Sequence, residues 1–174
     1  MNRDGRRRFF GLMPHHPSRK RVRGFFRKTE NLTIQIPALP RPRLAELQGK
    51  YSWIKSVEPD NSPTKAVTLC LGTVLRPDEP SLSGAEYEVR LQPHQSITLG
   101  YQQAVWLVAH QDEFPKFMAL LGKVYIDFPG LVVVSGSGGR FVPYLGQDGE
   151  RWYLHWHWLS YGIHSGGRIA ASSK

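Results

Sequence analysis

The sequence predicts an α+β domain, in which an antiparallel sheet is accompanied by two short helices and preceded by a disordered, basic tail. Three observations predict this class. Arg, Lys and Pro crowd residues 1–50, residues 51–174 hold alternating and apolar runs separated by turn residues, and helical apolar spacing is clearest in residues 99–121. We therefore divide the chain into a tail, 1–50, and a folded α+β domain, 51–174.

The tail carries the basic charge of the chain. Residues 1–50 hold 13 Lys and Arg residues against 3 acidic ones. Charge repulsion and five prolines disfavour a long helix, so only residues 32–36 are expected to form a short strand. Contact with nucleic acid or an anionic surface is one hypothesis, and a solvated tail without a partner is the other. The candidate contact residues are Arg6, Arg7, Arg8, Arg19, Lys20, Arg21, Arg23, Arg27 and Lys28.

The domain is expected to be mainly strands. Runs of β-branched, aromatic and alternating residues lie between Pro, Gly, Asn and Asp clusters, and a glycine-rich stretch, 135–139, is expected to be a hairpin loop and not a phosphate cradle. The expected strands are 51–57, 65–75, 85–91, 123–127, 131–134, 141–145, 151–159 and 168–170.

Two helices are expected in residues 99–121. Thr98 can cap the first, and Asp112 can cap the second. Pro115 then falls in the first turn of the second helix, where its missing N–H costs little, and Gly122 supplies the stop.

The most informative segment is residues 151–159, Arg-Trp-Tyr-Leu-His-Trp-His-Trp-Leu. Successive side chains of a strand point to opposite faces. One face would hold Leu154 and three indoles, as core, and the other would turn Tyr153, His155 and His157 toward solvent. Exposed Tyr, His, Ser and Gly side chains are typical of binding surfaces, because rigid amphipathic rings combine with small adaptable neighbours.

Other chemistry has weaker support. The single cysteine, Cys70, lies between leucines and predicts a buried small side chain. A metal held by His155, His157 and His164 is an alternative, because two imidazoles on one strand face can converge on one ion. No nucleophile or carboxylate pair is selected by its context, so we expect a protein without enzymatic activity and without a cofactor.

The pattern Arg151-Trp152-x-Leu154-x-Trp156-x-Trp158-Leu159, followed by a small polar run and Arg168-Ile169-Ala170, resembles the C-terminal variable region of target proteins of diversity-generating retroelements. In that family, mutagenesis at adenines converts Asn codons into codons for Tyr, His, Ser, Gly and Asp. The x positions here hold residues of that set. The resemblance implies a variable binding face on a C-type-lectin-like fold.

The sequence thus predicts a non-enzymatic recognition domain whose partner is a protein or a glycan. No apolar run is long enough for a membrane helix and no secretory signal is evident, so we expect a cytoplasmic location. The expected ligand-binding residues are Tyr153, His155, His157, Ser160, Tyr161, His164 and Ser165.

Overall fold

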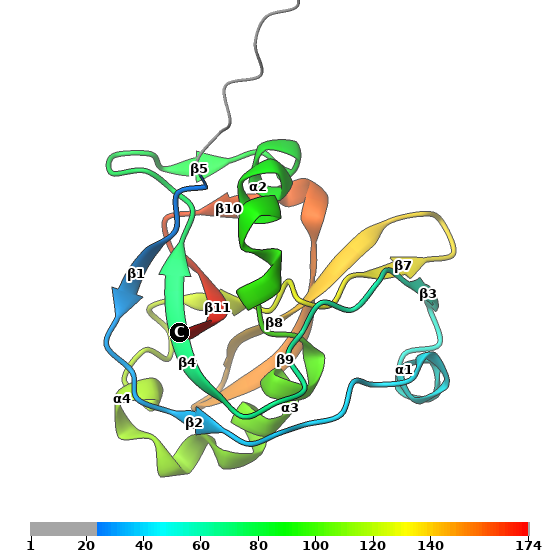
Figure 1. The fold of residues 1–174 in the computed structure, drawn as a ribbon, viewed down its shortest axis with the longest axis horizontal. Helices are drawn as coiled ribbons and strands as arrows, with labels where there is room; N and C mark the ends of the chain where they lie inside the picture. Colours follow the sequence, from blue (N-terminus) through cyan, green and yellow to red (C-terminus); the bar gives the residue numbers. More distant parts are fainter. Residues whose placement is uncertain (1–23, 174) are drawn as a thin grey trace, which may run out of the picture.

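A computed structural model describes residues 24–173 (Figure 1). This range contains eleven strands, four α-helices and three short 3₁₀ segments, and the expected α+β class is confirmed. The strands are β1 (Arg27–Glu30), β2 (Gln35–Ile36), β3 (Ile54–Val57), β4 (Val67–Thr73), β5 (Ser81–Leu82), β6 (Tyr125–Asp127), β7 (Val133–Ser135), β8 (Arg140–Asp148), β9 (Arg151–Trp158), β10 (Ile163–His164) and β11 (Gly167–Ser173). The helical elements are α1 (Leu44–Lys50), α2 (Gly84–Leu91), η1 (Gln92–Ile97), α3 (Tyr101–His110), η2 (Gln111–Glu113), α4 (Pro115–Met118) and η3 (Leu159–Tyr161).

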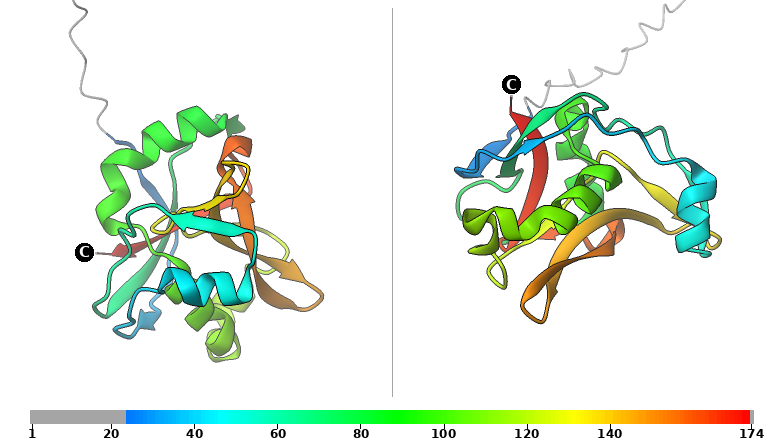
Figure 2. Two further views of the ribbon diagram at one scale, coloured as in Figure 1. Left: turned by 90° about the vertical axis from the view of Figure 1, so that its right-hand side faces the viewer. Right: turned by 90° about the horizontal axis from the view of Figure 1, so that it is seen from below.

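Nine of these strands form one sheet, in the order β1-β4-β11-β6-β8-β7-β3, with β2 beside β4 and β9 beside β8. The pairing is antiparallel except between β11 and β6, which makes the sheet mixed. β8 and β9 form one long, curved hairpin (Figure 2). A separate two-stranded sheet joins β5 to β10.

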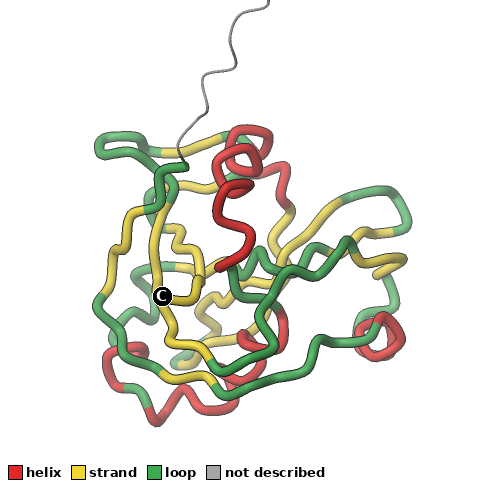
Figure 3. The backbone as a smooth tube through the Cα atoms, viewed as in Figure 1, coloured by secondary structure: helices red, strands yellow, loops and turns green. Residues whose placement is uncertain are grey.

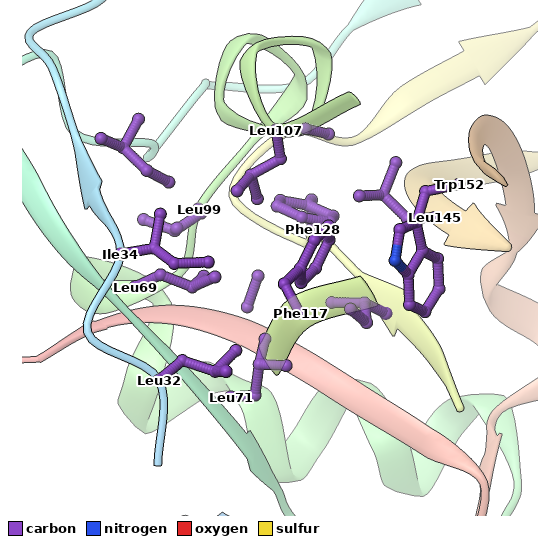
Figure 4. Packing of buried hydrophobic residues seen from close by; sticks show 14 residues of the cluster. Leu32, Ile34, Leu69, Leu71, Leu99, Leu107, Phe117, Phe128, Leu145 and Trp152 are labelled. Atoms are coloured by element: carbon purple, nitrogen blue, oxygen red, sulfur yellow. The ribbon is translucent and has the colours of Figure 1, made fainter. Parts of the chain in front are cut away.

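The helices lie in three separate places around the strands (Figure 3). α3 and α4 cover one part of the sheet, where Leu107 and Phe117 reach the main core together with Leu69 and Leu71 of β4 and Trp152 of β9 (Figure 4). Burying a side chain of this size stabilises the fold by about 1.5–3 kcal/mol. This end of the β8–β9 hairpin is therefore anchored by the core.

The predicted domain boundary at residue 50 does not hold for residues 24–50. β1 and β2 pair with β4, and Leu32, Ile34 and Ile36 are 5%, 4% and 0% exposed. Their alternation fills the core despite the neighbouring charges, so this stretch belongs to the folded domain. Most of the predicted basic contact residues, from Arg6 to Arg23, lie outside the described residues, whereas Arg27 and Lys28 are exposed on β1.

The predicted strand over 85–91 is wrong, because this segment is the helix α2. Ser83 caps it by accepting a hydrogen bond from the backbone N–H of Glu86 at 3.4 Å. Tyr87 and Leu91, four residues apart, are both buried on one face. Capping and that one-sided burial outweigh the period-two alternation of the sequence.

The two helices expected in residues 99–121 are present as α3 and α4, but with other caps. α3 begins after Gly100, whose N–H donates to the side chain of Gln103 at 2.9 Å, and Thr98 instead donates to Gln95 in η1. Pro115 opens α4 as predicted, whereas Asp112 lies in η2.

Candidate ligand-binding site

β9 is the extended strand that the alternation predicts. It pairs residue by residue with β8, from Asp148 opposite Arg151 to Phe141 opposite Trp158. The strand places its indoles on one face and Tyr153, His155 and His157 on the other. Within the described residues β9 pairs only with β8, so the other edge of β9 is an edge of the sheet.

The three indoles of β9 differ in burial. Trp152 is 0% exposed and stacks on Phe117 at a ring-centroid distance of 5.1 Å. Trp156 is partly buried and stacks on Tyr101 at 5.9 Å. The expectation that all three indoles are core is wrong for Trp158, which is 41% exposed.

Trp158 is exposed because it lies at the opposite end of the hairpin from the α3–α4 core. Its ring stacks on Phe141 at 6.1 Å and meets Tyr161 of η3 edge-on at 5.1 Å. Trp53, from the turn before β3, meets Phe141 edge-on at a ring-centroid distance of 5.1 Å. These four rings, Trp53, Phe141, Trp158 and Tyr161, form a continuous group that we call the aromatic row.

Three of the four rings in the aromatic row are well exposed. Trp53 is 38% exposed and Tyr161 is 73% exposed. Large aromatic side chains that contact one another on a surface favour an interaction with a ligand, since a folded protein gains little by leaving them in water.

His157 does not face solvent, contrary to the prediction. Its side chain is 13% exposed, and its Nδ1 lies 2.9 and 3.1 Å from the two carboxylate oxygens of Asp127, which is 0% exposed. Asp127 also accepts a hydrogen bond from the hydroxyl of the buried Tyr87 at 2.8 Å. A buried carboxylate needs such donors, and the fold supplies them from β9 and α2. We call Tyr87, Asp127 and His157 the buried trio.

The contacts within the buried trio shift the pKa values of His157 and Tyr87. Burial alone lowers the pKa of His157, but the hydrogen bond to Asp127 and the charge of that carboxylate outweigh it, so the pKa lies above the usual 6.5. Burial, followed by the nearby carboxylate, raises the pKa of Tyr87 well above 10. Tyr87 therefore remains a hydrogen-bond donor at physiological pH.

The other predicted residues on this side of β9 are spread out. Tyr153 is 44% exposed near the turn of the hairpin. His155 is partly buried and its ring tilts toward Tyr144 at 5.4 Å. Tyr144 in turn meets His157 edge-on at 5.9 Å.

The segment after β9 brings further predicted residues to the same end of the hairpin as Trp158. Tyr161, in η3, contacts Trp158, and His164, in β10, packs against Tyr125 at 4.9 Å. Ser160 and Ser165 are exposed. The structure thus joins Tyr161, His164 and His157 in one neighbourhood.

A hollow of about 470 Å³ lies in this neighbourhood. Its size falls in the range of small-molecule sites, which are mostly apolar with a few placed polar groups. Burial raises the pKa of Tyr125 to about 12, so the polar edge of that ring keeps its proton. The lining residues contain no Lys, Arg, Asp or Glu: they are Tyr125, Phe141, Tyr144, Trp156, His157, Trp158, Tyr161, Gly162 and His164.

Another hollow, of about 370 Å³, lies beside Arg140. The guanidinium of Arg140 donates to Glu58 at 2.6 Å and also to Glu88. Arg140 is thus paired with two carboxylates, and these ion pairs connect β8 to α2 and to the chain after β3. We therefore assign this group a structural role.

The predicted metal alternative is not supported. Within residues 24–173 no group of three or more His, Cys, Asp and Glu side chains could hold a metal ion. His157 directs Nδ1 to Asp127, and His164 uses Nδ1 to accept the N–H of Gly166 at 3.1 Å. The three histidines therefore do not form a ligand set.

The sequence analysis missed residues of the aromatic row, the hollow and the buried trio, and it treated Trp156 and Trp158 only as core. The missed residues are Trp53, Tyr87, Tyr125, Asp127, Phe141 and Tyr144. Phe141 could have been found, because a two-residue turn between Asp148 and Arg151 fixes the register that sets it opposite Trp158. Asp127 carried no local signal, since it is 30 residues away from His157.

Comparison with known proteins gave no match to a protein-family model, a curated protein or a solved structure. The described part of the chain has no helix that is both long and apolar enough to span a membrane.

Proposed function

We propose that this protein is a recognition domain that binds a saccharide in the hollow at the end of β9. The observation that carries the proposal is the exposed aromatic row, which borders a hollow lined by phenol and imidazole groups. Phe141, Trp158 and Tyr161 belong to both the row and the hollow.

A sugar ring needs two kinds of surface, an apolar face for its C–H groups and polar partners for its hydroxyls. Trp158 and Phe141 supply flat apolar area, while Tyr125 and His164 supply hydroxyl and imidazole groups. Desolvated polar groups must find partners, so the phenols and imidazoles determine which hydroxyl pattern fits. This chemistry favours a saccharide over a strongly charged partner such as nucleic acid, because no Lys or Arg lines the hollow.

The resemblance to retroelement-diversified proteins is part of the proposal. Ser160, Tyr161 and His164 are exposed, as a variable binding face requires, whereas His157 is held in the buried trio and Tyr153 lies outside the hollow. A reverse transcriptase gene near the coding DNA, together with a near-repeat that differs only at adenines, would support it. The absence of both would contradict it.

The cytoplasmic location and the partner class remain predictions. Cell fractionation tests the location. Binding through the basic arm to nucleic acid predicts affinity that falls steeply with salt, whereas saccharide binding in a hollow without Lys, Arg, Asp or Glu predicts a much weaker salt dependence. A measured salt series with each class of probe separates these outcomes.

The function is tested on a glycan array with the full chain. We expect selective capture of a saccharide that is lost in Trp158→Ala and in Tyr161→Ala. Tyr153→Ala is the matched control, because Tyr153 is a similarly exposed ring on the same strand but does not line the hollow. Array binding that fails for all saccharides, or that Tyr153→Ala removes while Trp158→Ala does not, would contradict the proposal.

A further inference from the structure

His157 occupies a special position, because it belongs both to the buried trio and to the lining of the hollow. Its Nδ1 edge is fixed against Asp127 at 2.9 Å. The two nitrogens of an imidazole lie on roughly opposite edges of the ring. Once Nδ1 donates to the carboxylate, Nε2 is the nitrogen left for a ligand.

The charge of the trio depends on one proton. With a neutral His157, Asp127 is a buried negative charge with two neutral donors, Tyr87 and the imidazole. With a protonated His157, the two charges compensate and Nε2 becomes a second donor. The pKa of His157 is raised in spite of burial, which agrees with this preference for the protonated form.

The groups around His157 provide no fixed charge inside the hollow. Tyr125 of β6 and Tyr144 of β8 meet its ring edge-on at 5.7 and 5.9 Å. From the other elements, α2 contributes Tyr87, η3 contributes Tyr161, and β10 contributes His164, which is exposed.

Arg168 of β11, a permanent cation whose charge acts on Tyr125, donates to Glu30 at 2.6 Å. The proton on His157 therefore decides whether the negative charge of Asp127 is compensated beside the hollow.

We infer that His157 makes the hollow selective for a saccharide that carries a carboxylate, such as a uronic acid, and that Asp127 acts as the residue that positions it. His157 offers an N–H to the ligand carboxylate only when its imidazole is protonated, because its Nδ1–H is used by Asp127. At higher pH the unprotonated ring leaves Asp127 uncompensated and repels an anion. This inference rests on the proposed saccharide function and adds the ligand's charge and the pH dependence of its binding.

The test uses two matched pairs of probes, methyl galactoside with galacturonate and methyl glucoside with glucuronate. Binding to the full chain is followed by isothermal titration or NMR shifts at about pH 5.5 and about pH 8.5, on either side of the imidazole range. We expect a uronate to bind about tenfold more tightly at the lower pH, since one unit of pKa shift corresponds to a factor of ten. The affinity for the methyl glycoside of each pair should differ by less than about twofold between the two pH values.

Variants assign the effect to His157. His157→Gln should remove the pH dependence, whereas His155→Gln should keep it. If His164→Gln removes it and His157→Gln does not, the inference is overturned. Asp127→Asn should move the midpoint of the pH dependence downward, which a purely structural role would not do.

A measurement on the unmodified chain covers the case in which His157→Gln fails to fold. Bound uronate must raise the NMR titration midpoint of His157, because proton and ligand binding are reciprocally linked. An unchanged midpoint overturns the inference. If neutral and acidic sugars bind equally well, only this inference is overturned. If no sugar binds, either on the array or in this titration, the proposed function is overturned too.

Discussion

Asp127 and His157, from strands β6 and β9, share a hydrogen bond of 2.9 Å that joins the core of the fold to the proposed binding hollow. Asp127 has no access to solvent, and His157 has little. The same contact therefore contributes to stability and orients a side chain that a ligand can touch. It makes His157 unlike its strand neighbours Tyr153 and His155, with which the alternation of the sequence groups it.

Removing the imidazole should destabilise the fold. His157→Ala leaves the buried Asp127 without its charged partner, and breaking a buried pair in this way costs about 3–5 kcal/mol. His155→Ala, on the more open part of the same face, should cost about 1 kcal/mol or less. Urea denaturation of the two variants checks this difference, and equal losses would contradict the role given to the trio.

Stability should depend on pH through His157. Its folded pKa is raised above the ordinary 6.5 by Asp127, although burial opposes the rise. The pair thus contributes its full stability below pH 6.5 and loses it as the pH rises through the folded pKa. We expect the difference in unfolding free energy between the wild type and His157→Gln to shrink from acid to alkaline pH.

The comparison with His157→Gln is needed because His94 acts in the opposite direction. Burial lowers the pKa of His94, so its contribution is lost as the pH falls. His94 is present in both proteins and cancels in the difference. A difference that grows with pH would contradict the assignment.

The indoles of β9 should separate folding from binding. Trp152→Ala removes a fully buried ring that stacks on Phe117 and should cost about 3–5 kcal/mol. Trp158→Ala removes an exposed ring and should cost about 1 kcal/mol or less. Thermal and urea unfolding measure both. A large loss in Trp158→Ala would show that the aromatic row is structural and not a binding surface.

Gly162 should tolerate no side chain. Its φ of +71° with ψ of −150° is a conformation that only glycine adopts readily, and a Cβ there would overlap the carbonyl oxygen of Leu82. Gly162→Ala should therefore destabilise the domain and disturb the wall of the hollow. Gly136→Ala, where a Cβ meets nothing within 4 Å, is the control. Equal melting temperatures for the two variants would contradict this account.

Local patterns in the sequence predicted the strand β9, the helices after residue 99 and the hairpin loop before β8, because these depend on neighbouring residues. The helix α2 was mistaken for a strand, although Ser83 followed by Glu86 three residues later is a capping signal. The short strand expected over 32–36 is present in part as β2, but the remaining fold of residues 24–50 was missed because their charge and prolines are typical of a disordered tail.

The binding hollow was harder to predict, because its parts come from distant segments. The alternation of β9 separates two faces but does not say where the core ends along the strand, so Trp158 was placed inside and His157 outside. Both positions are decided by tertiary neighbours, Phe141 and Asp127, which lie 17 and 30 residues away. Pairing register could indicate the first of these, but no local pattern indicates the second.

The saccharide proposal is tested most directly by the indole N–H signals of the five tryptophans in an NMR titration with the saccharide captured on the array. We predict that the signals of Trp158 and Trp156, which line the hollow, shift during the titration, and that those of Trp106 and Trp152 do not. Shifts confined to Trp106, or no shift at any indole while the saccharide binds, would contradict the proposed site.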